Sequence, residues 1–96
     1  MDILVSYDVK TETAEGRRRL RHVAKHCTNY GQRVQYSVFE CRVDDVQYEV
    51  LRAKLRDTID PDTDSIRMYK LRQPREQSVE SFGLNKYVDF DDPLIL

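Results

Sequence analysis

The run Ile3-Leu4-Val5-Ser6-Tyr7-Asp8-Val9 near the start of the chain determines how the remainder can fold. Apolar, β-branched and aromatic residues dominate it, a composition typical of a strand buried at the centre of a sheet. The run contains one carboxylate, Asp8, at a strand end where packing gives no reason for a charge. We therefore expect a central strand that carries an acidic side chain to a cleft at its end.

A basic amphipathic helix is expected next, over residues 16–30. Its apolar residues recur every three or four positions, and most of its basic residues fall on the outward arc. Thr11 or Thr13 is suited to cap the start, and Gly31 to adopt the left-handed conformation after the end. The inward stripe is Leu20, Val23, Ala24 and Cys27, and the outward residues are Arg18, Arg21, His22, Lys25 and His26.

The extended region over residues 34–43 changes the phase of its alternation part way along. Such a shift indicates a bulge or a turn, here near Ser37. One long bent strand and a tight hairpin of two strands both satisfy the pattern. The apolar positions are Val34, Tyr36 and Val38 before the shift, and Phe39, Cys41 and Val43 after it.

A second helix over residues 46–59 and a strand over residues 65–71 follow. Asp44 or Asp45 is expected to cap the helix, and three aspartates with a proline at positions 60–64 predict the turn after it. A short strand is possible at residues 79–82. The inward residues of the helix are Leu51, Leu55 and Ile59, with Tyr48 one turn earlier.

With a hairpin near Ser37, the order becomes β-α-β-β-α-β, the split pattern of ferredoxin-like α+β domains. Two helices would cover one face of an antiparallel sheet, and a dimer mate is the simplest cover for the other face. We divide the chain into a domain over residues 1–72 and a C-terminal extension over residues 73–96, whose apolar end after Pro93 is expected to dock on another chain.

The chain is short and unevenly charged. Its 96 residues, of which 40% are hydrophobic and 34% charged, suffice for one domain, and part of the apolar surface is expected to be buried against another subunit. The formal net charge is -1, but the seven basic and two acidic residues from Lys10 to Arg33 sum to +5, which leaves -6 for the rest. A basic segment in an acidic chain can present one attractive face to phosphates.

Other classes of protein are disfavoured. No apolar run approaches the ~18 residues of a membrane-spanning helix, and the N-terminal residues lack the layout of a secretory signal, so we expect a cytoplasmic protein with no membrane partner. Cys27 and Cys41 are expected as buried thiols, and the scattered glycines form no phosphate-binding loop. His22 and His26 have the spacing of a zinc pair but lack a third ligand.

Asp8 is the first candidate for chemistry. As a structural residue it would cap a turn or pair with an arginine. As a functional residue it would bind a hard cation such as Mg²⁺, which takes one or two carboxylates, water and substrate phosphates. One carboxylate per chain makes a poor site, whereas two copies of Asp8 across a two-fold axis make a credible one.

The basic helix allows two interpretations as well: a solvated face or a surface that follows phosphates. The aromatic rings of Tyr7, Tyr36 and Phe39 can either stack on bases or pack in the core.

Several segments together resemble one known family. They are the strand that ends in Tyr7-Asp8-Val9, the Arg-rich helix, and residues 31–40, 64–69 and 93–96. In these segments the chain resembles the CRISPR-associated endoribonucleases, the smaller of the two universal CRISPR adaptation proteins. The resemblance runs from the first strand to about Leu71, and the last four residues are similar to one branch of the family.

The resemblance implies a ferredoxin-like homodimer, formed through the sheet face, in which Asp8 and its mate hold Mg²⁺ or Mn²⁺ and activate water against a phosphodiester. It favours the hairpin near Ser37 and implies a C-terminal strand that adds to the partner's sheet. The residues implied to bind nucleic acid are Tyr7, Arg17, Arg19, Arg33, Ser37 and Phe39; those expected to bind a partner are Pro93, Leu94, Ile95 and Leu96.

Two functions of different classes follow. The first is a metal-dependent endonuclease that hydrolyses phosphodiester bonds of RNA or DNA and takes part in spacer insertion. The second, an architectural role that the resemblance also implies, is a non-catalytic dimeric DNA-binding adaptor that bridges dimers of the larger integrase. The adaptor function has the simpler structural requirement, because binding needs only distributed charge whereas hydrolysis needs a defined metal geometry.

Overall fold

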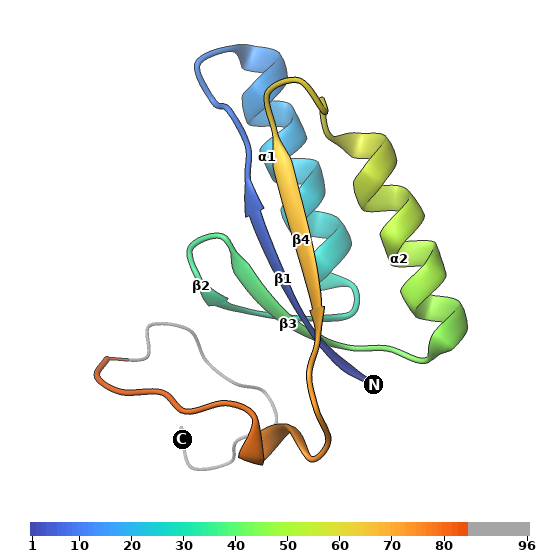
Figure 1. The fold of residues 1–96 in the computed structure, drawn as a ribbon. Helices are drawn as coiled ribbons and strands as arrows, with labels where there is room; N and C mark the ends of the chain where they lie inside the picture. Colours follow the sequence, from blue (N-terminus) through green and yellow to red (C-terminus); the bar gives the residue numbers. More distant parts are fainter. Residues whose placement is uncertain (85–96) are drawn as a thin grey trace.

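The computed structural model describes residues 1–84, which form one antiparallel sheet with two helices on one side of it. Figure 1 shows the two helices next to each other behind the strands. The predicted α+β order β-α-β-β-α-β is confirmed. The elements are β1 (Asp2–Asp8), α1 (Ala14–Thr28), β2 (Gly31–Gln35), β3 (Val38–Arg42), α2 (Asp45–Thr58), β4 (Ser65–Lys70) and the short 3-10 helix η1 (Arg75–Gln77).

Strand β1 lies inside the sheet, as its apolar composition predicts. The strand order is β2-β3-β1-β4, and β1 pairs antiparallel with both β3 and β4. Val5 lies opposite Phe39 on β3 and opposite Met68 on β4. Because paired residues share a face of the sheet, the alternation along β1 fixes which side chains of three strands face the helices.

The core lies between the sheet and the helices. Ile3, Val5 and Tyr7 point into it from β1, and the predicted inward stripes of both helices meet them there. Within residues 1–84 neither helix is long and apolar enough to cross a membrane. The buried residues of this core are Ile3, Val5, Tyr7, Val9, Val23, Cys27, Phe39, Cys41, Val43, Leu51 and Leu55.

Both helices begin at side-chain caps. The Gly16 amide donates a hydrogen bond of 3.0 Å to the hydroxyl of Thr13, one of the two residues predicted to cap α1. Asp44 forms a capping box with Gln47, in which each side chain accepts a hydrogen bond from the other residue's amide. These bonds satisfy amide donors that the first helical turn leaves without partners.

The extended region near Ser37 is a hairpin. Strand β2 ends at Gln35, residues 36 and 37 form the turn, and β3 begins at Val38. The pairing register also shifts between Arg33 and Gln35, so a bulge accompanies the turn. The turn and the bulge together account for the change of phase in the sequence.

Two local expectations are wrong. Among residues 1–84, Gly83 is the one residue with a positive φ, so Gly31 does not adopt the left-handed conformation. Gly31 instead begins β2, where a Cβ would overlap the carbonyl oxygen of Glu40 and lie 2.5 Å from the Cα of Cys41. Residues 79–82 are not a strand; Val79 and Phe82 line a hollow over the face of the sheet that the helices leave open, together with Leu4 and Val38. Because residues 79–82 lie over this face and not beside an edge strand, they do not pair with the sheet.

The close approach of β2 and β3 at Gly31 yields a stability prediction. Gly31→Ala should lower the free energy of unfolding by about 2 kcal/mol, because the added methyl group overlaps backbone that cannot move freely. Urea denaturation should detect this loss. Gln35→Ala, an exposed position in the same strand, should change stability by less than about 0.5 kcal/mol, and equal effects of the two substitutions would contradict the proposed close contact.

Candidate functional site at the end of β1

Asp8 lies on the open face of the sheet, opposite to the helices. The alternation of β1 sends Tyr7 into the core and Asp8 to the other side, where its side chain is exposed. Asp8 pairs with Ser65 at the start of β4. Within residues 1–84 its carboxylate has no hydrogen bond and no ion pair.

Two polar residues of β4 lie next to Asp8 on this face. Ser65 lies opposite Asp8, and Arg67 lies opposite Ser6, one step further along the same face. The Arg67 guanidinium donates a hydrogen bond of 3.2 Å to the hydroxyl of Tyr69. Ser65 and Arg67 were not among the residues predicted from the sequence, although the alternation of residues 65–70 places both on one face of β4.

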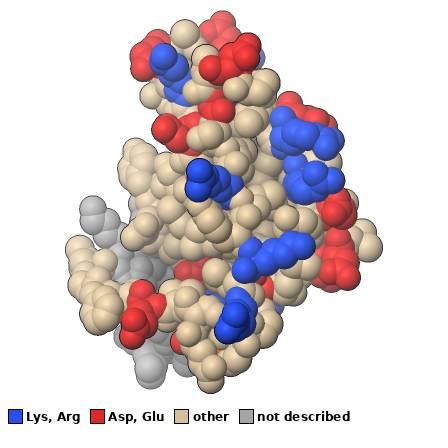
Figure 2. Space-filling view, in the orientation of Figure 1, with Lys and Arg blue, Asp and Glu red and all other residues tan. Residues whose placement is uncertain are grey.

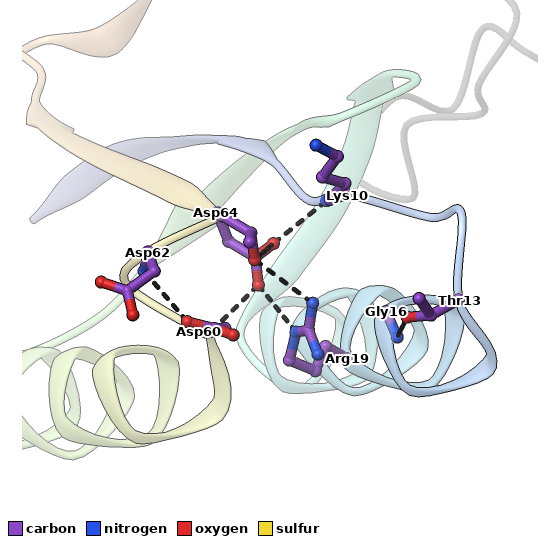
Figure 3. A network of polar contacts seen from close by, with 8 residues as sticks. Lys10, Thr13, Gly16, Arg19, Asp60, Asp62 and Asp64 are labelled. Carbon is purple, nitrogen blue, oxygen red and sulfur yellow. Dashed lines mark hydrogen bonds and ion pairs between the residues drawn. The ribbon is translucent and has the colours of Figure 1, made fainter.

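Asp64 organises the loops around this site. Its buried carboxylate accepts hydrogen bonds from the Lys10 amide (3.0 Å), the Asp60 amide (3.0 Å), the Thr63 hydroxyl (3.0 Å) and the Arg19 Nε (2.8 Å). Figure 3 shows this carboxylate between the loop after β1, helix α1 and the turn before β4. One side chain thereby connects the segments that flank Asp8 and Ser65.

The protonation state of Asp64 is part of this arrangement. Burial by itself raises the pKa of the carboxyl, but the hydrogen bonds from Arg19 and from the two amides and the hydroxyl outweigh it and hold the pKa far below its usual range. The Arg19–Asp64 ion pair is shielded from solvent on the aspartate side, where the exposed fraction is 0%. The folded state therefore favours the ionised form of Asp64.

The structural roles considered for Asp8 are performed by other aspartates. Asp64 binds the loop amide and pairs with an arginine, and Asp2 accepts hydrogen bonds from Arg42 (3.0 Å) and Gln73 (2.9 Å). For Asp2, burial raises the pKa while these two bonds lower it, and the net effect is a lowered pKa. Asp8 differs from both because it is exposed and has no such partner among residues 1–84.

The arginines predicted to bind nucleic acid are engaged within the chain. The Arg17 side chain donates to the carbonyl oxygen of Thr11 (3.2 Å), and Arg19 pairs with Asp64. The Arg33 guanidinium lies over the Phe39 ring at 5.2 Å from its centroid. These contacts use the cations for packing and loop attachment in the structure described.

Tyr7 and Phe39 belong to the core, one of the two interpretations of these rings. They stack with centroids 6.3 Å apart and are exposed by only 5% and 2%. Neither ring is accessible for stacking on a base. Ser37 lies at the hairpin turn, where its carbonyl oxygen accepts the Tyr7 amide at 3.1 Å, and residues 93–96 lie outside the described residues.

The described part of one chain does not form a metal centre by itself. Within residues 1–84 no three His, Cys, Asp or Glu side chains are grouped to hold an ion. Asp8 has the oxygen chemistry that Mg²⁺ or Mn²⁺ requires, but it is one ligand. The donor set is sufficient only if further oxygens come from outside residues 1–84 of this chain.

The fold and this site define a small ferredoxin-like protein with an exposed carboxylate at the end of an inner strand. A family model described as "CRISPR associated protein Cas2" matches residues 1–79. With that match over most of its length, the chain belongs to the Cas2 family.

Relatives agree over the whole chain. A protein of Moorella thermoacetica named "CRISPR-associated endoribonuclease Cas2 1" is 50% identical over 96 residues, 100% of both chains. One of Halalkalibacterium halodurans named "CRISPR-associated endonuclease Cas2" is 48% identical and covers 99% of each chain. The crystal structure of Streptococcus pyogenes Cas2 at pH 6.5 is 53% identical, with a TM-score of 0.78 over 86% of this chain and 100% of that one.

The network around Asp64 predicts a pH-dependent stability. Because the folded state lowers the pKa of Asp64, its contribution is complete above the unfolded value near 4 and is lost as the pH falls below it. Asp64→Asn should cost about 2 kcal/mol at pH 7, measured by urea denaturation, and should flatten the loss of stability between pH 5 and pH 2. The control Asp62→Asn removes an exposed carboxylate in the same turn; identical pH profiles for the two variants would contradict this role.

Proposed function

We propose that this chain is a cytoplasmic nuclease of CRISPR adaptation that hydrolyses phosphodiester bonds of nucleic acid and uses Asp8 as its catalytic carboxylate. One observation carries the proposal: Asp8 is exposed and unpaired within residues 1–84, whereas Asp2 and Asp64 are buried and hydrogen-bonded. A carboxylate with no structural partner among these residues is available to bind a cation. The names of the relatives, endoribonuclease and endonuclease, support the same reaction class.

The proposed active unit is a homodimer formed through the open face of the sheet. That face carries the polar residues near Asp8, and further along it Leu4 and Val38 line a hollow with Val79 and Phe82; the helices cover only the other side. Two copies related by a two-fold axis would bring two Asp8 carboxylates together. The pair would then supply the two carboxylate ligands that one chain lacks for Mg²⁺ or Mn²⁺.

The roles of the protein groups follow from their positions. A bound divalent ion would supply Lewis-acid chemistry and lower the pKa of a water ligand. Asp8 would hold the ion and orient the attacking water by accepting its hydrogen bond. Arg67 lies near Asp8 on the same face, where its guanidinium can bind an oxygen of the scissile phosphate and fix the orientation of the substrate.

Replacing the carboxylate tests this proposal. Asp8→Asn should reduce the rate of RNA or duplex DNA cleavage in Mg²⁺ or Mn²⁺ by at least about 100-fold, because the amide binds cations poorly and is not a base. Asp62→Asn removes the same charge from an exposed turn and should leave the rate unchanged. Cleavage that persists in EDTA, or in the Asp8→Asn protein, would overturn the proposal.

A non-catalytic adaptor is the second candidate function. The observation that favours it is that Asp8 stands alone as a potential metal ligand at this site, with no group of metal ligands within residues 1–84. In this role the dimer would bind duplex DNA and dock on the larger CRISPR integrase through residues 93–96.

The adaptor role makes its own prediction. Deleting residues 93–96 should abolish co-purification with the integrase while the protein remains a dimer by light scattering, and Asp8→Asn should leave spacer insertion intact. A deletion that dissolves the dimer and preserves the integrase contact would assign the tail to dimerisation instead.

A further inference from the structure

Tyr36, in the turn of the β2–β3 hairpin, holds an aromatic ring in solvent. The residue is 82% exposed, whereas Tyr7 and Phe39, the other two rings considered for base stacking from the sequence, are buried. Within residues 1–84 the Tyr36 hydroxyl has no hydrogen bond, and its ring has no aromatic or cationic partner. A single exposed ring is ordinary on a protein surface, so the surroundings of Tyr36 decide whether it has a role.

The turn itself does not require a tyrosine. Two-residue hairpin turns favour asparagine, aspartate and glycine, because these residues adopt left-handed conformations at low cost. Tyr36 and Ser37 do not adopt such a conformation, since no residue other than glycine has a positive φ within residues 1–84. Strand pairing extends to Gln35 and Val38 on the two sides of the turn without any contact from the ring. The Tyr36 ring therefore has no structural role among the described residues.

The turn lies beside the end of β1 that carries Asp8. The Tyr7 amide donates a hydrogen bond of 3.1 Å to the carbonyl oxygen of Ser37. Asp8 follows Tyr7 and Tyr36 precedes Ser37, so in these antiparallel strands both residues lie one step further toward the same end of the sheet. Neighbouring strands are about 5 Å apart. Figure 1 shows the hairpin turn next to this end of β1, so the ring and the carboxylate flank one site.

Three groups of different chemistry meet at this end of the sheet. Asp8 has β4 on its other side, where Arg67 lies one step along the same face. A carboxylate suits a divalent cation, a guanidinium suits a phosphate oxygen, and an aromatic ring suits the face of a base. The set Asp8, Arg67 and Tyr36 therefore offers a contact for each part of a nucleotide at a cleavage site.

The surface at the turn favours an uncharged contact. Figure 2 views the open face of the sheet, where acidic and basic side chains are interspersed. Residues 35–38 carry no charge. A phosphate would need a cation at this position, whereas the face of a base is bound by an aromatic ring without one. The turn is suited to a base and not to the backbone of a nucleic acid.

We propose that Tyr36 is a substrate-positioning residue, whose ring stacks on an unpaired base next to the phosphodiester bond cleaved at Asp8. The proposal rests on the proposed function, because it assumes that a nucleic acid is cleaved there. In a duplex the bases stack on one another, so the ring reaches the face of a base only where the strand is unpaired. RNA and DNA share this face, and the contact does not depend on the sugar.

Substitutions at Tyr36 test the contact by binding in EDTA. The probe is a single strand of about 16 nucleotides, either RNA or DNA, and the full chain carries Asp8→Asn so that cleavage is excluded. Tyr36→Leu removes the aromatic face but keeps an apolar side chain, and should weaken binding of both strands by about tenfold. Tyr36→Phe keeps the ring and should bind within about threefold of the parent chain.

Two controls separate stacking from other effects. Val46→Ser removes an apolar side chain that is 73% exposed on α2, and should leave the affinity for the single strand unchanged. Tyr36→Leu should not change the affinity for a duplex of the same sequence, nor the slope of log affinity against log salt, because it removes no charge. Equal losses for Tyr36→Leu and Tyr36→Phe, for duplex and single strand, or with one of the two sugars only, would overturn the proposal.

Fluorescence and kinetics test the position of the ring. With 2-aminopurine in place of adenine, binding to the Asp8→Asn chain should quench the fluorescence of the single strand, and Tyr36→Leu should remove most of that quenching. In the chain that retains Asp8, Tyr36→Leu should raise KM by about tenfold and change kcat by less than about threefold. Unchanged quenching or an unchanged KM would overturn the proposal.

Failure of this proposal can be distinguished from failure of the nuclease proposal. A Tyr36→Leu protein that binds and cleaves like the wild type would overturn the stacking contact, while loss of cleavage in Asp8→Asn would still support the nuclease. Cleavage that survives Asp8→Asn would end the nuclease proposal. In that case a single strand bound about tenfold more weakly by Tyr36→Leu would still place a base at the hairpin turn.

Discussion

The buried carboxylate of Asp64 is the constraint on which the end of the sheet around Asp8 depends. It joins the loop after β1 to helix α1 and to the turn before β4. Arg19, its partner on α1, lies 45 residues earlier in the chain. A carboxylate can be buried at this position because four donors satisfy it and a cation balances its charge. With this carboxylate in place, Asp8 and Ser65 are held opposite each other, and within residues 1–84 neither side chain forms a bond of its own. Within residues 1–84, Asp64 thus has the structural role, and the side chain of Asp8 has no partner.

The elements of the fold were predictable because their signals are local. The apolar run of β1 and the stripes of α1 and α2 are periodic within a few residues, and the structure confirms them. The residues do not decide between a hairpin and a bent strand near Ser37. Tyr36-Ser37 is not one of the Asn-Gly, Asp-Gly or Gly-Gly pairs that mark a two-residue hairpin turn. The prediction of a left-handed Gly31 is wrong because a glycine is favoured both in a left-handed turn and where two strands approach closely. Only the position of β3 distinguishes these two cases.

The site was predictable at Asp8 and not around it. A charge at the end of an apolar strand is visible in the sequence, whereas the role of Asp64 arises from contacts with residues far away in the chain. The same limit applies to the arginines. Sequence places Arg17, Arg19 and Arg33 among the basic residues, but only the structure shows that they contact Thr11, Asp64 and Phe39. Alternation alone distinguishes the buried Tyr7 from the exposed Asp8.

The adjacency of Tyr7 and Asp8 has a consequence for how this protein can evolve. Because side chains of a strand alternate between faces, a change of one residue in the length of β1 would exchange the two, placing a carboxylate in the core and an aromatic ring in solvent. A change of two residues would preserve the faces and move the acid along the strand. Insertions and deletions within β1 must therefore involve an even number of residues if both side chains are to keep their faces of the sheet.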